Sequence, residues 1–229
     1  MKYIVTGINS GLGKFLHEII PNSLGIDRNN LSSVLSKINS NDIIVHCAFN
    51  KTNNITNYYD YLEDNIFLTK KLLELGNRII YISSIDTYKQ NNVYTMFKKF
   101  GESIICKNSN NLVIRCPVLL GKYMKPNHLI KLRDNDDTLT LCGTSSFNYI
   151  TYNDVFKFIT TTSLNGICDL ISRDNVELND IKELFNSKTV LGNYKYETTN
   201  QFDNPMYTSR TSLMTVKNYF KLIKEIYEY

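Results

Sequence analysis

The feature that most constrains the fold is a cluster of glycines directly after the first apolar stretch. The chain begins MKYIVTGINSGLGKFLHEII, in which a buried strand ends at Gly7 and residues 12–20 have the apolar periodicity of a helix. Gly11 and Gly13 complete the cluster. Glycines at such a position allow a sharp reversal and a close approach between backbones. The pattern predicts a strand, a tight turn and a helix that opens at the turn.

The same alternation of short apolar runs and amphipathic stretches continues along the chain. Apolar runs that predict strands occupy residues 2–7, 23–27, 42–48, 78–84 and 111–121. Helical periodicity occupies residues 12–20, 31–38, 58–76 and 94–108. Such alternation is typical of parallel strands joined by helices on both faces of one sheet. We therefore predict an α/β fold, a Rossmann-like doubly wound parallel sheet.

Composition and charge exclude several classes of partner. The 229 residues carry a net charge of +4 on scattered basic residues, and no run of 18 apolar residues occurs. We therefore expect neither nucleic acid nor a membrane as a partner. The five cysteines lack CxxC spacing, which predicts reduced thiols, no metal site and a cytoplasmic location. Because the first residues already form a predicted strand, we expect no signal peptide.

The glycine turn has the composition of a phosphate-binding loop. In dinucleotide sites, such glycines let the backbone approach the pyrophosphate, and the amides of the following helix point at it. Asp27 lies 20 residues after Gly7, at the end of the second predicted strand, where a carboxylate binds the adenosine ribose. Arg28 either reaches a 2′-phosphate or lies at the surface. The pattern predicts NAD(H) or NADP(H) as the cofactor and leaves the preference open.

A second group of residues has the chemistry for proton transfer. Tyr94 and Lys98 are four apart on a predicted helix and project from one face. An ammonium beside a phenol favours the phenolate, so we expect the pKa of Tyr94 to lie below its usual value of about 10. Such a tyrosine exchanges a proton with a carbonyl or alcohol, and Ser84 can hold the same oxygen.

In this order, these residues resemble the short-chain dehydrogenase/reductase superfamily. The sequence looks most like the extended branch, the NAD-dependent epimerase/dehydratase family that acts on nucleotide sugars. "VTGINSGLG" is similar to the cofactor loop, "IIVHCAFN" to the "viHlAa" strand end, and "YISSIDTY" to "SSaavYG". "NIFLTKKLLE", "VIRCPVLLG" and "FNYITYNDV" resemble later family segments. The match covers most of the chain.

The resemblance implies roles for particular residues. It makes Ser84, Tyr94 and Lys98 the catalytic residues. It implies that the cofactor is bound by Thr6, Gly7, Asn9, Ser10, Gly11, Leu12, Gly13, Asp27, Arg28, Cys47, Ala48, Asn65, Tyr94, Lys98 and Pro117. We expect residues 1–121 to form the dinucleotide-binding Rossmann core. We expect residues 122–229 to complete the sheet and to form a reduced substrate subdomain. The family also implies a homodimer formed through the helices that carry Asn65 and Tyr94.

Departures from the family pattern reduce the number of reactions that we expect the chain to catalyse. Ile85 follows Ser84 where family dehydratases have the first member of an Asp–Glu pair, which disfavours dehydration. We therefore predict a ketoreductase acting on a nucleotide-linked 4-keto sugar. "GTSSFNYI" lacks the arginine with which many relatives bind the nucleotide diphosphate. A 4-epimerase that keeps NAD bound is one alternative. The other is a non-catalytic NAD(P)-binding protein, because Tyr94 follows Ser84 by only 10 positions.

Overall fold

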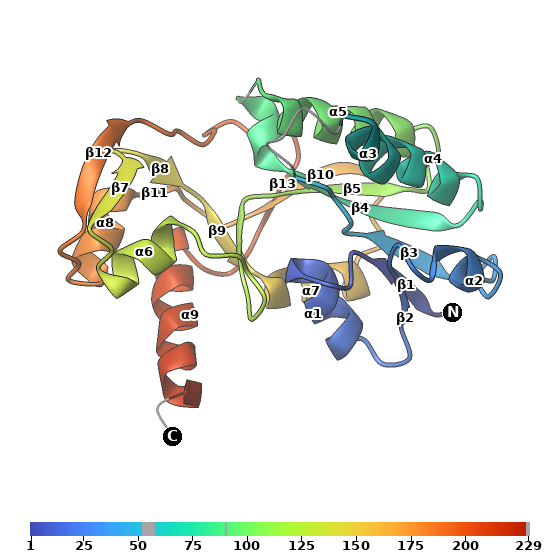
Figure 1. The fold of residues 1–229 in the computed structure, drawn as a ribbon, viewed down its shortest axis with the longest axis horizontal. Coiled ribbons are helices and arrows are strands. Elements are labelled where there is room, and N and C mark those ends of the chain that lie inside the picture. The colour runs from blue at the N-terminus through green and yellow to red at the C-terminus, as the bar shows by residue number, and fades with distance from the viewer. Residues whose placement is uncertain (52–57, 90, 228–229) are drawn as a thin grey trace.

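The computed structural model describes residues 1–51, 58–89 and 91–227. The amphipathic pattern of residues 213–229 predicts a final helix, and its last two residues lie outside this range. Its centre is a sheet of seven parallel strands (Figure 1). Across the sheet the strands are β13 (Pro205–Tyr207), β10 (Gly166–Ile171), β5 (Leu112–Cys116), β4 (Arg78–Ser84), β3 (Ile43–His46), β1 (Tyr3–Thr6) and β2 (Leu24–Ile26). Every pairing between neighbours in this sheet is parallel.

Helices cover both faces of this sheet (Figure 1). One face carries α1 (Gly11–Ile19) and α7 (Tyr152–Thr161), and the other carries α3 (Tyr58–Leu62), α4 (Leu68–Leu73) and α5 (Val93–Ile105). Successive side chains of each strand enter opposite cores, as the period of two requires. In β1, Val5 packs with the α1 and α7 side chains, whereas Ile4 packs with those of α4 and α5. The predicted doubly wound α/β fold is confirmed.

The order of the strands determines where a crevice opens. β1 pairs with both β2 and β3. In the sequence, residues 27–42 join β2 to β3 and form turns and the short helix α2 (Leu31–Leu35) rather than another strand. The chain leaves β1 towards α1 on one face, and it leaves β3 towards α3 on the other face. In doubly wound sheets, ligands bind at such a switch point, beyond the carboxyl ends of the strands.

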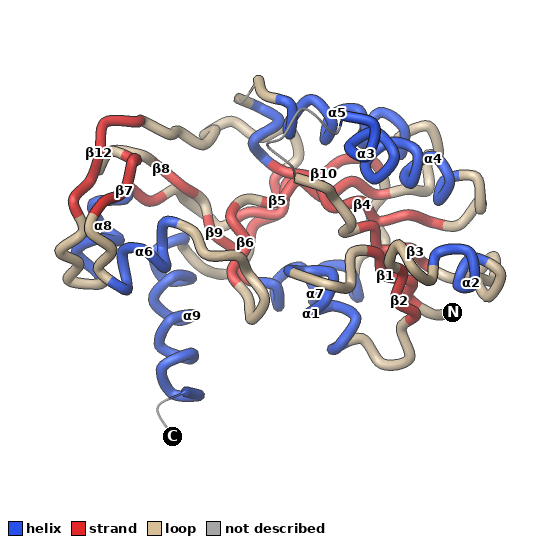
Figure 2. Tube along the Cα trace, viewed as in Figure 1, coloured by secondary structure: helices blue, strands red, loops and turns tan. Residues whose placement is uncertain are grey.

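A second, smaller part of the molecule follows the break at Pro117. It contains three two-stranded sheets, drawn as red tube on the left of Figure 2, and a separate hydrophobic core. The strand pairs are β6 (Val118–Leu120) with β9 (Tyr149–Thr151), β7 (Thr138–Leu141) with β12 (Val190–Tyr194), and β8 (Ser146–Phe147) with β11 (Val176–Glu177). The helices are α6 (His128–Asp134), α8 (Leu178–Leu184) and α9 (Ser212–Tyr227).

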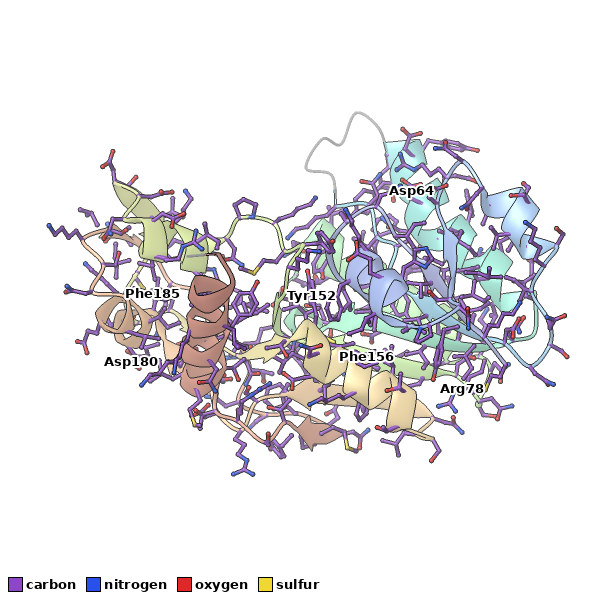
Figure 3. The ribbon with its side chains drawn as sticks, turned by 90° about the horizontal axis from the view of Figure 1, so that it is seen from below. Asp64, Arg78, Tyr152, Phe156, Asp180 and Phe185 are labelled. Carbon is purple, nitrogen blue, oxygen red and sulfur yellow. The ribbon has the colours of Figure 1, made fainter. Side chains whose placement is uncertain are left out.

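Residues after the break contribute to both parts. Figure 3 shows Asp180 and Phe185 in the second part, Asp64 and Arg78 in the sheet part, and Tyr152 where the two parts meet. α7, β10 and β13 return to the central sheet. The predicted boundary near residue 121 stays a proposal, because the chain crosses between the two parts more than once after it.

The predicted helix over residues 58–76 contains a π-helical turn. α3 continues into η2 (Glu63–Phe67) and then α4. Asn65, in the π turn, accepts the backbone N–H of Asn50 at 2.7 Å and donates to its carbonyl at 3.0 Å. The Asn65 amide therefore fastens the loop after β3 to the helix. π turns are often found at functional sites, and a periodicity of 3.6 residues does not reveal them.

A buried chain of hydrogen bonds joins β1 and β3 to α4. Thr69 Oγ1 donates to the Asn65 carbonyl at 2.7 Å, so it accepts from His46 Nε2 at 2.9 Å. His46 Nδ1 then accepts from Thr6 Oγ1 at 2.8 Å, and the Thr6 oxygen accepts the Ala48 amide at 3.0 Å. Burial lowers the pKa of His46 to about 3, so the ring stays neutral. This series of hydrogen bonds fixes Thr6 and Ala48 at the crevice between β1 and β3.

Replacing Thr69 by valine tests this chain. The variant keeps the side-chain shape but leaves the buried His46 N–H without its acceptor, so we expect unfolding free energy to fall by about 1–3 kcal/mol in urea titrations. Thr160→Val is a matched control, because the exposed Thr160 hydroxyl also bonds the carbonyl four residues earlier. We expect a change within about 0.5 kcal/mol there. Equal losses in the two variants would contradict the account.

Candidate active site

A cleft of about 1390 Å³ opens at the switch point between β1 and β3. Of the residues predicted to bind cofactor, the cleft is lined by Thr6, Gly7, Asn9, Ser10, Gly11, Leu12, Gly13, Asp27, Arg28, Cys47, Ala48, Tyr94 and Lys98. Two predicted residues do not line it. Asn65 is buried, with its amide bonded to Asn50, and Pro117 lines a smaller pocket instead. The first group therefore forms one continuous site.

The glycine turn brings backbone segments too close together for side chains at two of its positions. A Cβ on Gly7 would lie 2.9 Å from Ala48 N, and a Cβ on Gly13 would lie 2.4 Å from the Gly7 carbonyl oxygen. Gly11, with φ of 56°, starts α1 in the left-handed region. Ser10 is the N-cap of α1 and makes no side-chain capping bond to it. The Ser10 hydroxyl and the first amides of α1 thus form a donor set that fits a pyrophosphate.

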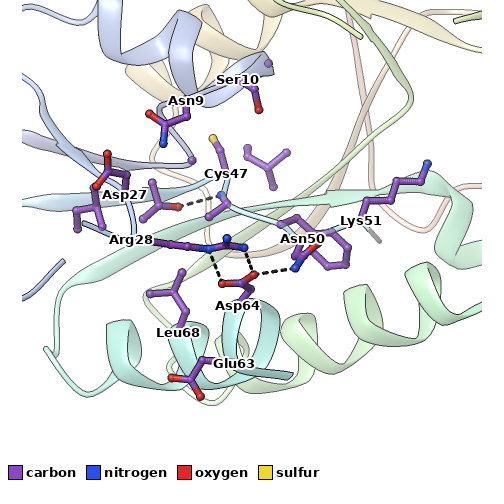
Figure 4. Close-up of a pocket in the computed structure, with 18 of the residues that line it drawn as sticks. Asn9, Ser10, Asp27, Arg28, Cys47, Asn50, Lys51, Glu63, Asp64 and Leu68 are labelled. Carbon is purple, nitrogen blue, oxygen red and sulfur yellow. Dashed lines mark hydrogen bonds and ion pairs between the residues drawn. The ribbon is translucent and has the colours of Figure 1, made fainter. Parts of the chain in front are cut away.

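The far end of the cleft carries Asp27 and Arg28. Asp27 Oδ1 accepts the backbone N–H groups of Asn29 at 2.8 Å and Asn30 at 3.0 Å, which fixes the carboxylate in a local turn. Arg28 extends along the cleft to Asp64 of η2 (Figure 4). Its Nε donates to Asp64 Oδ1 at 3.1 Å, and its Nη2 pairs with Oδ2. Arg28 is therefore held by a carboxylate.

Ser84 and Tyr94 come together despite the short segment between them. The chain leaves β4 at Ser84, passes through the 3₁₀ helix η3 (Ile85–Tyr88) and enters α5. The side chain of Asn92 caps α5 by accepting the Thr95 amide at 3.0 Å. This start of α5 places Tyr94 beside Ser84, and both side chains line the same small pocket.

Lys98 lies one turn further along α5 and is buried. Its Nζ donates to the Ile82 carbonyl at 2.7 Å. The same Nζ lies 4.1 Å from the centre of the Phe49 ring and 6.0 Å from the centre of the Tyr94 ring. Phe49 also meets Tyr94 edge to face, with ring centres 5.1 Å apart. Phe49, which occupies the last small position of "viHlAa", therefore contacts both side chains.

These surroundings correct one expectation about the electrostatics of the site. The pKa of Tyr94 is raised, first by burial and then by the charge of Asp86, while the neighbouring Ser84 hydroxyl acts in the opposite direction. The predicted lowering by Lys98 is wrong for this structure, because that ammonium bonds a carbonyl and faces Phe49. Burial lowers the pKa of Lys98 itself to about 8. At neutral pH Tyr94 keeps its proton and Lys98 keeps its charge.

A second pocket of about 250 Å³ lies beside Ser84 and Tyr94. It is lined by Ser84, Ile85, Asp86, Tyr94, Pro117, Val118, Phe147, Asn148, Tyr196 and Thr198. Tyr196 donates a hydrogen bond to Asp86, and its ring stacks on Phe147 with centres 4.7 Å apart. Lys89 Nζ donates to the Thr198 carbonyl at 3.1 Å. Tyr94 lines both this pocket and the large cleft.

Sequence reasoning missed several of these residues. Phe49 and Asn50 lie in the loop that follows β3, three and four positions after its end, so the strand order alone would have placed them near the switch point. Asp64 reaches the cleft from a π turn that periodicity cannot reveal. Tyr196 comes from a segment 110 positions beyond Asp86, and we find no local signal in the sequence that pairs them.

Metal-binding clusters and membrane-spanning helices are both absent from the described residues, 1–51, 58–89 and 91–227. These residues contain no group of three or more His, Cys, Asp or Glu side chains placed to hold a metal ion. None of their helices is both long and apolar enough to cross a membrane.

Comparisons with known proteins identify the fold. No protein-family model matches the chain, and no curated protein sequence matches it. Among solved structures, dTDP-4-dehydrorhamnose reductase from Bacillus anthracis, in complex with NADP, has a TM-score of 0.76 at 17% identity, covering 97% of this chain and 100% of that one. dTDP-glucose 4,6-dehydratase from the same organism, in complex with NAD, has a TM-score of 0.72 at 14% identity, covering 100% and 99%.

An epimerase also has this fold. UDP-glucose 4-epimerase from Thermotoga maritima, with UDP-glucose, has a TM-score of 0.73 at 12% identity, covering 97% of this chain and 99% of that one. At such identities the likeness shows the fold alone. The predicted resemblance to the extended branch of the short-chain dehydrogenase/reductase superfamily is confirmed at the level of the fold.

Proposed function

We propose that this chain is an NAD(P)-dependent ketoreductase that reduces a 4-keto or 4-keto-6-deoxy sugar carried on a nucleotide. One observation carries the proposal: Tyr94, which shares the smaller pocket with Ser84, also lines the large cleft. A proton donor at that junction faces a large site that could take a dinucleotide on one side and, on the other, a small pocket that could take the reacting part of a substrate. The reductase and dehydratase of similar fold, bound to NADP and NAD, support the choice of cofactor.

The large cleft suits a nicotinamide dinucleotide, which when bound supplies a hydride. The amides and Ser10 hydroxyl at the start of α1 would hold its pyrophosphate. Asp27 would accept the hydroxyls of the adenosine ribose. Lys98, buried and charged, would donate to the nicotinamide ribose. These are the roles that the resemblance implies for the same residues.

The smaller pocket would take the keto group of the substrate. Tyr94 keeps its proton at neutral pH, so it would protonate the carbonyl oxygen as that oxygen gains negative charge. Ser84 would hydrogen-bond the same oxygen. Ile85 in this pocket has no proton to give, which argues against dehydration. Since about 250 Å³ lies below the usual range for whole ligands, the nucleotide would extend beyond the pocket.

Two other functions predict different behaviour. A 4-epimerase must first take a proton from an alcohol, and a buried phenol with a raised pKa is poorly suited to that step. An epimerase would also purify with bound NAD and show no net redox change. A non-catalytic NAD(P)-binding protein is favoured by one observation, the contact of Phe49 with both Tyr94 and Lys98. Absence of turnover with every substrate would select it.

We also propose a homodimer in the cytoplasm. On α5, Val93, Met96 and Phe100 are 43%, 49% and 59% exposed and recur on one helix face. Tyr58 and Tyr59 of α3 add exposed aromatic surface on the same layer of helices. Aromatic side chains and methionine are enriched at protein interfaces. The five cysteines are all free thiols, as expected in a reducing compartment.

Tyr94→Phe tests the proposed proton donor. Because the phenyl ring fills the same space without a transferable proton, we expect NADH- or NADPH-dependent reduction of 4-keto-6-deoxy nucleotide sugars to fall by about 10²–10⁴-fold. Cofactor affinity, measured by calorimetry, should stay nearly unchanged. Tyr194→Phe, at an exposed tyrosine of β12, is the control and should keep full turnover. Turnover retained in Tyr94→Phe would remove Tyr94 from the mechanism.

The pKa of Lys98 predicts a pH profile. Since this pKa lies near 8, the ammonium is charged below that pH and loses its charge above it. We expect kcat/KM for reduction to be steady below pH 8 and to decline above it. In Lys98→Arg the guanidinium stays charged, so the residual activity should lack the decline. The same decline in wild type and variant would assign it to another group.

Substitutions on α5 test the proposed dimer. We expect the wild type to have twice the chain mass of 26.5 kDa by light scattering after gel filtration. Combining Met96→Glu with Phe100→Glu should yield monomers, because it places charges on the apolar face. Val190→Glu, at an exposed position of β12, should leave the mass unchanged. A monomeric wild type, or a dimeric double variant, would refute this interface.

A further inference from the structure

The charged residues at the adenosine end of the cleft distinguish between the two candidate cofactors. NAD(H) has a hydroxyl at the adenosine 2′ position, which a carboxylate accepts, whereas NADP(H) has a phosphate there, which needs cations. The sequence places an acid and a base side by side, Asp27 and Arg28, and does not choose between them. The structure adds a third residue, Asp64, which the sequence did not connect with either.

Asp64 binds Arg28, the residue next to Asp27 whose guanidinium could bind a 2′-phosphate. Both of its oxygens bind the Arg28 guanidinium, at 3.1 Å for Nε and in close contact for Nη2. Oδ2 also accepts a hydrogen bond from Asn50 Nδ2 at 2.8 Å. The close-up in Figure 4 shows these bonds spanning the cleft between the residues after β2 and η2. Bidentate pairing uses the planar edge of guanidinium that phosphate would otherwise bind.

The surroundings strengthen the negative side of this balance. The Asp64 side chain is only 19% exposed, whereas that of Arg28 is 77% exposed. Asp60 also acts on Arg28 electrostatically. If a 2′-phosphate drew Arg28 away, the largely buried Asp64 carboxylate would lose its partner. It would then face the negative charge of the phosphate.

Two lysines on the same wall do not reverse this balance. Lys70 and Lys71 line the cleft, but Glu63 and Glu74 line it beside them. Asp27, by contrast, is preset for a hydroxyl, because its Oδ1 already accepts two backbone N–H groups. This arrangement receives a ribose 2′-hydroxyl without breaking an ion pair.

We infer that Asp64, by holding Arg28, makes this cleft select NAD(H) over NADP(H). The inference rests on the proposed function, since it assumes that the cleft binds a nicotinamide dinucleotide. Asp64 acts through Arg28 and is a specificity-determining residue on a different wall of the cleft from the strand that carries Asp27. Without it, Arg28 is free to meet a 2′-phosphate.

Binding measurements on the full chain test the inference without relying on turnover. The wild type should bind NADH more tightly than NADPH in isothermal titration calorimetry. Asp64→Asn should shift the ratio of the two affinities towards NADPH by about fivefold, the scale of one exposed ion pair. Glu63→Gln is the matched control, because it removes one negative charge from the same wall but not the carboxylate that Arg28 binds. It should change the ratio by less than twofold.

A double variant separates release of Arg28 from a general change of charge. Adding Arg28→Ala to Asp64→Asn should abolish the gain for NADPH. A wild type that prefers NADPH, an Asp64→Asn shift no larger than that of Glu63→Gln, or a gain that survives without Arg28 would overturn the inference. If the wild type binds neither NADH nor NADPH, the proposed function fails and the inference fails with it. Binding of both with an unchanged ratio overturns the inference alone.

Discussion

The close approach of β1 to the loop after β3 is the constraint on which the site depends. Gly7 leaves no room for a side chain, because a Cβ would lie 2.9 Å from the backbone of Ala48. The neutral His46 ring holds the two strand ends together by bonding Thr6 on one side and Thr69 on the other. The crevice at the switch point thus has rigid walls before any ligand enters it.

Residues from distant parts of the chain meet around this crevice. The first turn, the end of β2 and the loop after β3 line one cleft, and the start of α5 adds Tyr94 to it. The second part of the molecule completes the small pocket by returning Tyr196 to Asp86. Tyr94 stands between the two cavities. In the proposed function, Tyr94 in that place would donate the proton to a substrate carbonyl group.

Much of the fold and of the cleft lining could be predicted from the sequence. The features that could not be predicted depend on contacts formed only in the folded chain. Strong periodicity and the glycine turn predicted the sheet, its helices and most of the cleft lining. Asn65, which the sequence predicts to bind the cofactor, does not line the cleft, because its amide bonds the backbone of Asn50. The pKa of Tyr94 was expected to fall but rises, since burial, Asp86 and the place of Lys98 depend on tertiary packing. Contacts such as that of Arg28 with Asp64 join residues 36 positions apart and leave no periodic signal.

In the proposed function, a nicotinamide dinucleotide held in the large cleft would supply a hydride to a ketone held in the small pocket. The most direct test supplies cofactor that carries deuterium at the transferable position, together with a 4-keto-6-deoxy nucleotide sugar. The product is then examined by mass spectrometry and NMR. The account predicts a product with one deuterium on the former carbonyl carbon and an equal amount of oxidised cofactor. A sugar recovered without deuterium, with the cofactor still reduced, would contradict it.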